Sequence, residues 1–217
     1  MLQTNVELPL ILVGAGGHAR VLASTLLQLG RRISGVVDPD KSRTELLGIP
    51  FLGGDDAVFR YDRTEVLLVN GIGSVASIAN RLKVYEHFRE AGYRFASVIH
   101  PGAIIAPEGQ LADAVQIMAG AVVQTGFTVE EDCIINTGAR IDHDCVIRAH
   151  AHVAPGAVLS GSVYVGARAH IGAGAVVIQG VKIGSDSIIG AGAVVLSDVP
   201  ESCTVVGVPA RPTRVKA

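Results

Sequence analysis

The chain has 217 residues, with 18 Lys and Arg against 20 Asp and Glu and a formal net charge of −2. This balance excludes the broad basic field with which proteins bind nucleic acid or an anionic membrane surface. Residues 1–12 carry no basic segment and their apolar run is too short to span a bilayer, so we expect a cytoplasmic protein. The three cysteines are an odd number, which favours free thiols over a disulfide framework.

The first elements predict a βαβ unit. An apolar strand over 9–13 runs into the glycine-rich turn Gly14-Ala15-Gly16-Gly17-His18. A helix is expected over about 18–29, and a second strand over 33–37 ends at Asp38. Gly14, Gly16 and Ala19 fit the small-residue positions of a dinucleotide-binding pattern. The pattern is short, so a nucleotide phosphate or sugar, or a purely structural turn, remains an alternative.

A second unit of the same kind follows. Residues 65–70 predict a strand, Gly71-Ile72-Gly73 a second glycine turn, 75–91 a helix, and 93–98 a last strand. The carboxyl ends of parallel strands are where open α/β sheets bind ligands. We therefore expect Asp38, Gly14 to His18 and Gly71 to Gly73 to converge on one crevice.

A six-residue period organises the second half of the chain. An aliphatic residue returns at every sixth position, and a small residue follows most of these four positions later. A strict period of six indicates a parallel β-helix, because an α-helix or an ordinary strand would show other periods. Three hexads make one coil of eighteen residues around a triangular prism. The inward positions are Ile99, Ile105, Leu111, Ile117, Val123, Val129, Ile135, Ile141, Ile147, Val153, Leu159, Val165, Ile171, Val177, Ile183, Ile189 and Val195.

These patterns predict a small Rossmann-like α/β domain over 1–98 and a parallel β-helix over 99–197. A C-terminal tail is expected over 198–217, in which Asp198 to Pro200 cap the prism. The segment from Val206 to Ala210 is expected to lie extended along the outside.

The histidines of the repeat are its candidates for acid–base chemistry near neutral pH. His152 and His170 are one coil apart and should stack, with His150 near them, whereas His143 is half a coil from His152. One prism cannot bring His143 and His152 together, but a neighbouring subunit can, which favours a site shared within a cyclic homo-oligomer.

His143 has an acid on either side, Asp142 and Asp144. A carboxylate held against one imidazole nitrogen makes the other nitrogen a better base. Two other interpretations are a histidine in a solvated acidic patch and a metal site of His143, His150, His152 and His170. The latter lacks any fixed-spacing motif, so no metal is expected.

The combination of these features resembles a known family. The hexad array with the tail Val206-Gly207-Val208-Pro209-Ala210 is similar to left-handed β-helix acyltransferases. The turn Gly14-Ala15-Gly16-Gly17-His18 and the segment from Asn136 to Cys145 narrow the resemblance to the NeuD and PglD group, to which perosamine N-acetyltransferases belong.

The resemblance implies a homotrimer with active sites between prisms, acetyl-CoA in the groove, and a nucleotide-linked amino sugar held by the N-terminal domain. His143 would be the general base, oriented by Asp144 and Asp142. Gly14, Gly16, Gly17, His18, Asp38, Gly71 and Gly73 would lie at the nucleotide-sugar site. Cofactor contacts would come from His152, Gly161, Ala173, Val206, Gly207 and Pro209.

The activity implied is acetylation of the 4-amino group of a GDP-perosamine or UDP-bacillosamine type of sugar, in polysaccharide or glycan biosynthesis. Pro39 follows Asp38 where relatives can carry a second acid, which leaves the base, uracil or guanine, open. The alternatives are O-acetylation of a sialic acid type of sugar, a dinucleotide-binding protein with a structural solenoid, and a metal-dependent lyase.

Overall fold

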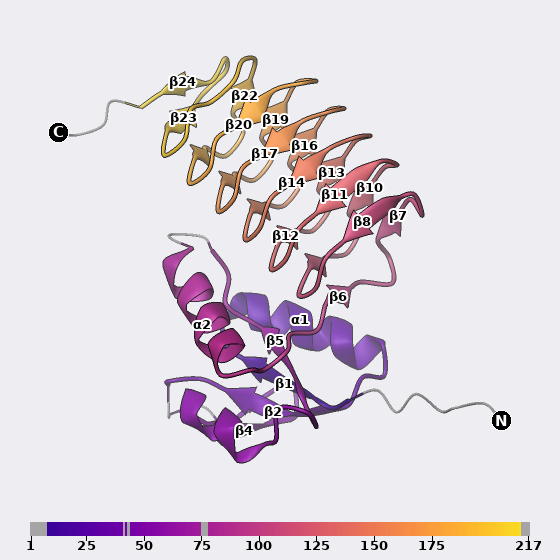
Figure 1. The fold of residues 1–217 in the computed structure, drawn as a ribbon, viewed down its shortest axis with the longest axis vertical. Helices are drawn as coiled ribbons and strands as arrows, with labels where there is room; N and C mark the ends of the chain where they lie inside the picture. Colours follow the sequence, from indigo (N-terminus) through magenta and orange to yellow (C-terminus); the bar gives the residue numbers. More distant parts are fainter. Residues whose placement is uncertain (1–7, 41, 43, 75–77, 214–217) are drawn as a thin grey trace. The chain divides into compact units, whose positions relative to one another are not determined.

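The computed structural model describes residues 8–40, 42, 44–74 and 78–213. The chain divides into two compact units, Met1–Val98 and Ile99–Ala217 (Figure 1). Within the described residues, no helix has both the length and the apolar character needed to cross a membrane.

The first unit is built on a five-stranded sheet in the order β3-β4-β2-β1-β5. All neighbours in it are parallel except the hairpin β3–β4. Because β1 lies between β2 and β5, the chain changes direction across the sheet at β1, which is where such sheets bind ligands. Its elements are β1 (Leu10–Val13), α1 (Gly17–Gln28), β2 (Ile33–Val37), β3 (Glu45–Leu46), β4 (Ile49–Gly53), the 3₁₀ helix η1 (Asp55–Arg60), β5 (Leu67–Asn70) and α2 (Ala79–Glu90).

The central strand and the first helix form as the apolar pattern predicts. All four residues of β1 are buried. Helix α1 buries Ala19, Leu22, Ala23 and Leu26, a stripe at the three- and four-residue spacing of one helix face. Gly30, with φ +67°, follows the helix end in the left-handed region that favours glycine.

Other expectations for this unit need correction. The strand expected over 93–98 is wrong: only Phe95 forms a bridge, to Leu68, while Val98–Ile99 becomes β6 of the β-helix. Tyr93 and Phe95 are buried, so packing of aromatic rings explains the apolar signal there. The hairpin β3–β4 and η1 were not predicted. Helix α2 begins at Ala79, and residues 75–77 of the expected helix lie outside the described residues.

The second unit is a left-handed parallel β-helix with three sheets. Arg140 pairs with Val122 on one side and Val158 on the other, so the register advances by eighteen residues per coil. The first sheet contains β6 (Val98–Ile99), β9 (Gln116–Ile117), β12 (Ile134–Ile135), β15 (His152–Val153), β18 (His170–Ile171), β21 (Ile188–Ile189), β23 (Thr204–Val206) and β24 (Arg211–Pro212). The second contains β7 (Ile104–Ile105), β10 (Val122–Val123), β13 (Arg140–Ile141), β16 (Val158–Leu159), β19 (Val176–Val177) and β22 (Val194–Val195). The third contains β8 (Gly109–Leu111), β11 (Phe127–Val129), β14 (Val146–Ile147), β17 (Tyr164–Val165) and β20 (Lys182–Ile183).

The inward positions fill the prism. From Ile117 to Val195 every sixth residue is at most 1% exposed. Cys133 and Cys145 are buried between these positions as thiols that form no disulfide within the described residues. Ile99 and Leu111 of the first coil are 38% and 36% exposed, in contrast to the expectation. Both residues belong to the first coil of the stack, so a neighbouring coil covers them on one side only.

From Ala114 to Gly192, each sharp corner of the prism places one residue per coil at positive φ. The corner between the first and second sheets uses only glycine, whereas the other two accept side chains. The residues between the first and second sheets, here called the glycine column, are Gly120, Gly138, Gly156, Gly174 and Gly192. Those between the second and third sheets are Gly126, Asp144, Ser162 and Gly180. Those between the third and first sheets are Ala114, Asp132, His150, Arg168 and Asp186.

The β-helix continues beyond the last regular hexad. Val199 forms a bridge to Ile183 and packs on the core, as expected for a cap. However, β23 pairs in parallel with β21, so residues 204–206 form another strand of the stack before the chain turns back as β24. Val205 of this strand is 4% exposed and points into the prism. The extended course expected for Val206 to Ala210 is wrong, because Val206 ends β23 and residues 207–210 form the turn to β24.

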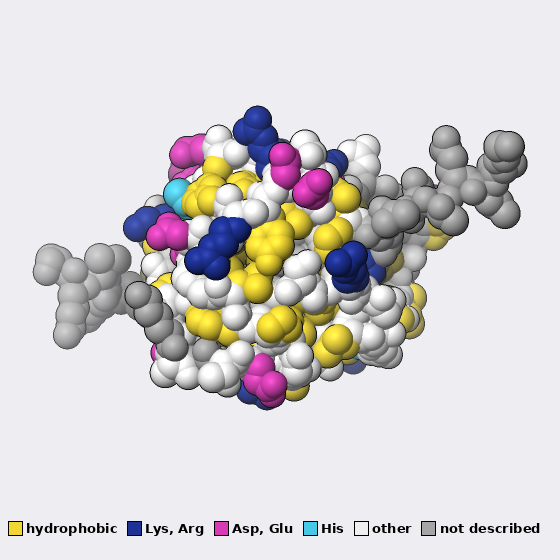
Figure 2. Space-filling model, turned by 90° about the horizontal axis from the view of Figure 1, so that it is seen from below, with side chains coloured by type: hydrophobic (Ala, Val, Ile, Leu, Met, Phe, Trp, Pro, Cys, Tyr) yellow, Lys and Arg dark blue, Asp and Glu magenta, His cyan; other side chains and the backbone are white. Residues whose placement is uncertain are grey.

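The surface agrees with the balanced charge. Figure 2 shows a face on which Lys and Arg are interspersed with Asp, Glu and hydrophobic side chains, without a continuous basic area.

The alternation of inward and outward residues can be tested on one strand. Ile189 of β21 is fully buried and its neighbour Ile188 is 46% exposed. Replacing Ile189 by Ala should lower the free energy of unfolding by about 2–5 kcal/mol through the cavity it leaves. The control Ile188→Ala should cost less than about 1 kcal/mol in the same urea titration. Equal losses would contradict the assignment of the two faces.

Candidate functional site

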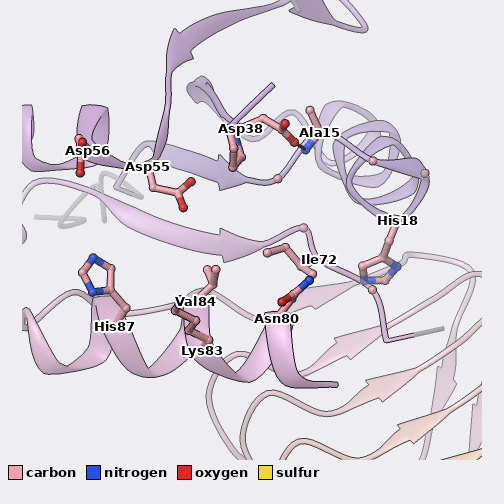
Figure 3. Close-up of a pocket in the computed structure, with 16 residues that line it drawn as sticks. Ala15, His18, Asp38, Asp55, Asp56, Ile72, Asn80, Lys83, Val84 and His87 are labelled. Atoms are coloured by element: carbon pink, nitrogen blue, oxygen red, sulfur yellow. Dashed lines mark hydrogen bonds between the residues drawn. The ribbon is translucent and has the colours of Figure 1, made fainter. Parts of the chain in front are cut away.

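A pocket of about 910 Å³ lies in the first unit at the carboxyl ends of β1 and β5 (Figure 3). Its walls come from the two glycine turns, the end of β2, η1 and α2. The structure thus brings together all seven residues expected at the nucleotide-sugar site: Gly14, Gly16, Gly17, His18, Asp38, Gly71 and Gly73.

The glycines of the pocket have different structural causes. Gly14 has φ +96°. A Cβ on Gly71 would lie 2.7 Å from the carbonyl oxygen of Val13 and 2.8 Å from Cβ of Ala19, so Gly71 lets the two turns pack closely. A Cβ on Gly16 or Gly17 would meet nothing within 4 Å. These two glycines begin α1 and leave its first N–H groups open to the pocket, the usual setting for an anionic group.

Asp38 braces the first glycine turn. Its Oδ2 accepts a hydrogen bond from the backbone N–H of Ala15 at 2.6 Å, and its Oδ1 accepts one from that of Asp40 at 2.9 Å. The carboxylate therefore holds the turn in shape while it faces the pocket (Figure 3).

A buried arginine, which the sequence analysis did not single out, shapes the second turn. Arg81 of α2 is fully buried, and its Nη1 donates to the carbonyl oxygens of Asn70 at 3.2 Å and Ile72 at 2.6 Å. The Asn70 side chain in turn donates to the Arg81 carbonyl oxygen at 3.3 Å. The sequence does contain a signal for this contact. Arg81 lies on the helix face that also buries Tyr85 and Phe88, where a charged residue is unusual.

Several other lining residues were also missed. Asp55 and Asp56 come from η1, and Asn80, Lys83 and His87 come from α2. Partial burial raises the pKa of Asp55, and the nearby charge of Asp38 adds to the effect. These residues carry no motif in the sequence, because only the packing of η1 and α2 around the sheet brings them together.

The second unit positions His143 at the corner between β13 and β14. Its Nδ1 lies 2.9 Å from Oδ2 of Asp144, and both side chains are about half exposed, at 46% and 64%. A carboxylate can only accept, so the ring proton lies on Nδ1 and Nε2 carries the free lone pair. Asp142 instead accepts the backbone N–H of His143 at 2.8 Å. The structure therefore assigns orientation of the ring to Asp144 and support of its backbone to Asp142.

Gly161 lies directly beside the imidazole, one coil above His143. A Cβ at this position would lie 2.5 Å from Cε1 of His143 and would also clash with Nε2. A Cβ on Gly126, one coil below Asp144, would similarly clash with the carboxylate, at 3.3 Å from Cγ. Two glycines thus make room for the His143–Asp144 pair on either side.

The electrostatics of this pair favour a base. The hydrogen bond to Asp144 raises the pKa of His143, the charges of Asp142 and Asp144 raise it further, and partial desolvation opposes them. Nearby, burial raises the pKa of the Cys145 thiol to about 11, and its Sγ donates to the Ser160 carbonyl oxygen at 3.3 Å. A thiol in this state is a poor nucleophile at neutral pH.

The other histidines form separate contacts on the first sheet and its edge. The rings of His152 and His170 meet edge to face at 4.9 Å, as the coil spacing predicts. Nδ2 of Asn136 lies 3.0 Å from Nε2 of His152, and the amide orientation is set by the N–H of Thr137, which donates to Oδ1 at 2.8 Å. Nε2 of a neutral His152 therefore accepts, and its proton lies on Nδ1.

His170 and His150 differ in their surroundings. Burial lowers the pKa of His170, and among the described residues its buried Nδ1 has no hydrogen-bond partner. Nδ1 of His150 lies 3.2 Å from the carboxylate of the fully buried Asp132. Within the described part of the chain, no three or more His, Cys, Asp or Glu side chains gather in an arrangement that could hold a metal ion.

The expected cofactor residues lie at two corners of the prism. Gly161 is at the corner of His143, between the second and third sheets. His152 lies on the first sheet, Ala173 at the corner that follows that sheet, and Val206 to Pro209 directly after β23 of the same sheet. The tail is held there because the Val194 N–H donates to the Gly207 carbonyl oxygen at 3.1 Å. One chain therefore does not assemble all of these residues around His143.

Comparisons with known proteins agree with both units. The PglD N-terminal domain family matches residues 9–88, and the bacterial transferase hexapeptide family, with six repeats, matches residues 162–197. No curated protein matches the sequence. A histidine-to-asparagine variant of perosamine N-acetyltransferase from Caulobacter crescentus, in complex with CoA and GDP-perosamine, is 37% identical over 95% of this chain and 97% of that chain, with a TM-score of 0.90.

The acetyltransferase domain of PglB from Neisseria gonorrhoeae, in complex with acetyl coenzyme A, is 33% identical. That match covers 94% of this chain and 98% of the other, with a TM-score of 0.89. Fold and comparisons together place the molecule among the hexapeptide-repeat acyltransferases. Within that class, the chain belongs to the NeuD and PglD family of sugar acetyltransferases, and it is an acetyltransferase.

The role of Asp144 can be tested by titrating the His143 ring. In Asp144→Asn the pKa of His143 should fall, because the hydrogen bond to Asp144 is the largest cause of its elevation. The control Asp142→Asn should lower it less, since Asp142 bonds to the backbone rather than to the ring. NMR chemical shifts of the imidazole against pH measure both. A larger shift in the Asp142 variant would contradict the assignment.

The space beside the ring provides another test. Gly161→Ala should displace the His143 imidazole toward solvent and lower kcat by about 10–100-fold, because misplacement of a reacting group by about 1 Å costs this much. The control Ser162→Ala alters the next corner residue but keeps its backbone N–H bond to the His143 carbonyl oxygen. It should leave kcat within about twofold of wild type. Unchanged turnover in Gly161→Ala would contradict the packing argument.

Proposed function

We propose that the chain transfers the acetyl group of acetyl-CoA to the 4-amino group of a nucleotide-linked 4-amino-4,6-dideoxy sugar, of the GDP-perosamine or UDP-bacillosamine type. The observation that carries this proposal is the free lone pair on Nε2 of His143, half exposed and facing the space left by Gly161. The relatives in complex with CoA and GDP-perosamine, or with acetyl coenzyme A, support the choice of both substrates.

The reaction needs no covalent enzyme intermediate. An uncharged amine attacks the thioester carbonyl carbon, a C–N bond forms, and the C–S bond breaks. Nε2 of His143 removes the proton that the nitrogen must lose, and this proton passes to the departing thiolate of CoA. Asp144 stabilises the imidazolium formed in between, as the hydrogen bond at 2.9 Å allows. The backbone N–H of Gly161 is the proposed donor to the developing oxyanion.

The cofactor is assigned to the corner after the first sheet. There the glycine column leaves the backbone uncovered: a Cβ on Gly138, Gly156, Gly174 or Gly192 would meet nothing within 4 Å. Positive φ alone does not require glycine, because Asp, His and Arg occupy the same conformation at another corner. A bound ligand that approaches this backbone accounts for the absence of side chains. His152, Ala173, Val206, Gly207 and Pro209 border the same region.

A homotrimer is part of this proposal, and the division of these residues between two corners supports a site shared between subunits. Packing the His143 corner of one subunit against the cofactor corner of its neighbour would complete three equivalent sites. The proposed nucleotide site remains within the first unit, in the pocket lined by Gly16, Gly17, His18 and Asp38. We keep a cytoplasmic location, where acetyl-CoA is made and used, as part of this proposal.

The catalytic assignment is tested by His143→Ala and His143→Asn. Both should lower kcat by at least about 100-fold, because general base catalysis contributes this much, while acetyl-CoA binding stays near normal. Release of the CoA thiol, measured over GDP-, UDP- and dTDP-linked amino sugars, gives the rate, and calorimetry gives the binding. The control is His100→Asn, because the His100 ring accepts a local hydrogen bond from the backbone N–H of Gly102 and lies outside both proposed sites.

Near-normal kcat in either His143 variant would overturn the assignment of the base. Thiol release with hydroxyl acceptors but with none of the amino sugars would overturn N-acetylation and favour O-acetylation. Saturable NAD binding without acetyl-CoA binding would overturn the transferase assignment.

A further inference from the structure

The pocket of the first unit extends well past the residues assigned to the phosphates and ribose. In Figure 3 the labelled side chains run from His18 and Ala15 at one end, past Asp38, to Asp55, with Asp56 and His87 beyond it. In α/β nucleotide sites the phosphates lie at the helix N-terminus and the acid at the end of the second strand contacts the ribose. A nucleotide bound in this way would place its base on the far side of Asp38, between η1 and α2.

This far part of the pocket has the chemistry of a base site. Val84 of α2 supplies an apolar side chain, and Lys83 and His87 flank it on the same helix. Asp55 faces them from η1 (Figure 3). The cavity of about 910 Å³ is large enough for a sugar nucleotide, whose base would be covered on one side by Val84.

Asp55 is an acceptor that the fold leaves unused. It is partly buried, and within the described residues no hydrogen bond reaches its carboxylate, in contrast to Asp38 with two backbone donors. Burial and the charge of Asp38 both raise its pKa. The charge of His87 opposes these effects. A partly buried carboxylate without protein donors can still accept hydrogen bonds, so a ligand that supplies N–H groups there gains binding energy.

The donors that fit best are those of guanine. Its N1–H and exocyclic N2–H₂ form a pair of adjacent donors that match the two oxygens of a carboxylate, a bidentate arrangement. Uracil presents one N–H between two carbonyl oxygens, and these would face the carboxylate with like partial charge. We propose that Asp55 selects a guanine nucleotide by accepting hydrogen bonds from N1–H and N2–H₂ of the base. This inference rests on the proposed function, of which it specifies the nucleotide.

A ribose diol also offers two adjacent donors, so it is the main competitor for Asp55. The position of Asp38 argues against it, since Asp38 lies at the end of β2, closer to the glycine turn that receives the phosphates. A ribose contact would also be indifferent to the base, which gives the two possibilities opposite consequences in a binding experiment.

The test measures binding of GDP, UDP and xanthosine diphosphate to the full chain by calorimetry, without acetyl-CoA. Wild type should bind GDP at least tenfold tighter than UDP. Asp55→Asn should weaken GDP by about 10–100-fold, because the amide can no longer accept both donors. It should not weaken UDP, because it removes the charge that faces the uracil carbonyls. The same variant should bind xanthosine diphosphate tighter than GDP, because xanthine replaces the 2-amino donor by a carbonyl that accepts from the amide. Glu86→Gln removes the same charge from an exposed position of α2 outside the pocket and should change none of these affinities.

Equal losses of GDP and UDP in Asp55→Asn would overturn the inference in favour of a ribose contact. Unchanged GDP binding, or no gain for xanthosine diphosphate, would overturn it as well. A wild-type enzyme that acetylates a UDP-linked amino sugar and binds UDP tighter than GDP would overturn this inference but leave the proposed function intact. Selective GDP binding without transfer to any amino sugar would overturn only the proposed function.

Discussion

The fixed eighteen-residue register of the stacked coils is the constraint on which the rest of the β-helix depends. Because each strand hydrogen-bonds to its counterparts one coil before and after, a residue contacts the residues eighteen positions away. This places Gly161 against His143 and Gly126 against Asp144, and it stacks His152 on His170. A close-packed interior of aliphatic side chains maintains the register, so the geometry of the His–Asp pair is supported by the whole stack.

The His143–Asp144 pair occupies a corner because corners are where the prism exposes side chains while its backbone stays rigid. Asp144 itself has φ +59°, a conformation that Asp tolerates better than most residues. In this conformation its carboxylate reaches the imidazole of the preceding residue at 2.9 Å. For the proposed role of His143 as a base, rigid placement on such a scaffold would reduce the reorganisation that catalysis requires.

The two units differ in the kind of site that their backbones can form. Parallel strands ending at glycine turns create an open pocket, whose shape is held by Asp38 on one turn and the buried Arg81 on the other. The β-helix instead repeats the same corner geometry from coil to coil. Our proposal accordingly places selection of the nucleotide in the first unit and proton transfer in the second.

The sequence by itself determined the features that arise from local periodicity: the coil length, the inward aliphatic positions, the βαβ units, and the convergence of the glycine turns with Asp38. Each of these follows from side-chain direction along one element or from the rule that parallel strands end together. Two predictions from the sequence were wrong. The strand expected over 93–98 is absent, because the apolar residues there are aromatic side chains that pack in the core. The β-helix extends beyond residue 197, because Val205 occupies an inward position that the six-residue period does not include.

Only the tertiary structure decided which groups meet across elements. The His143 ring forms its hydrogen bond with Asp144 rather than Asp142, and Nε2 of His152 contacts the Asn136 side chain. Asp55 lies across the pocket from α2, where no hydrogen-bond donor of the described residues reaches it. These contacts depend on side-chain rotamers and on the packing of segments far apart in the chain. No local pattern records them, because their energies come from distances in space rather than from positions in the sequence.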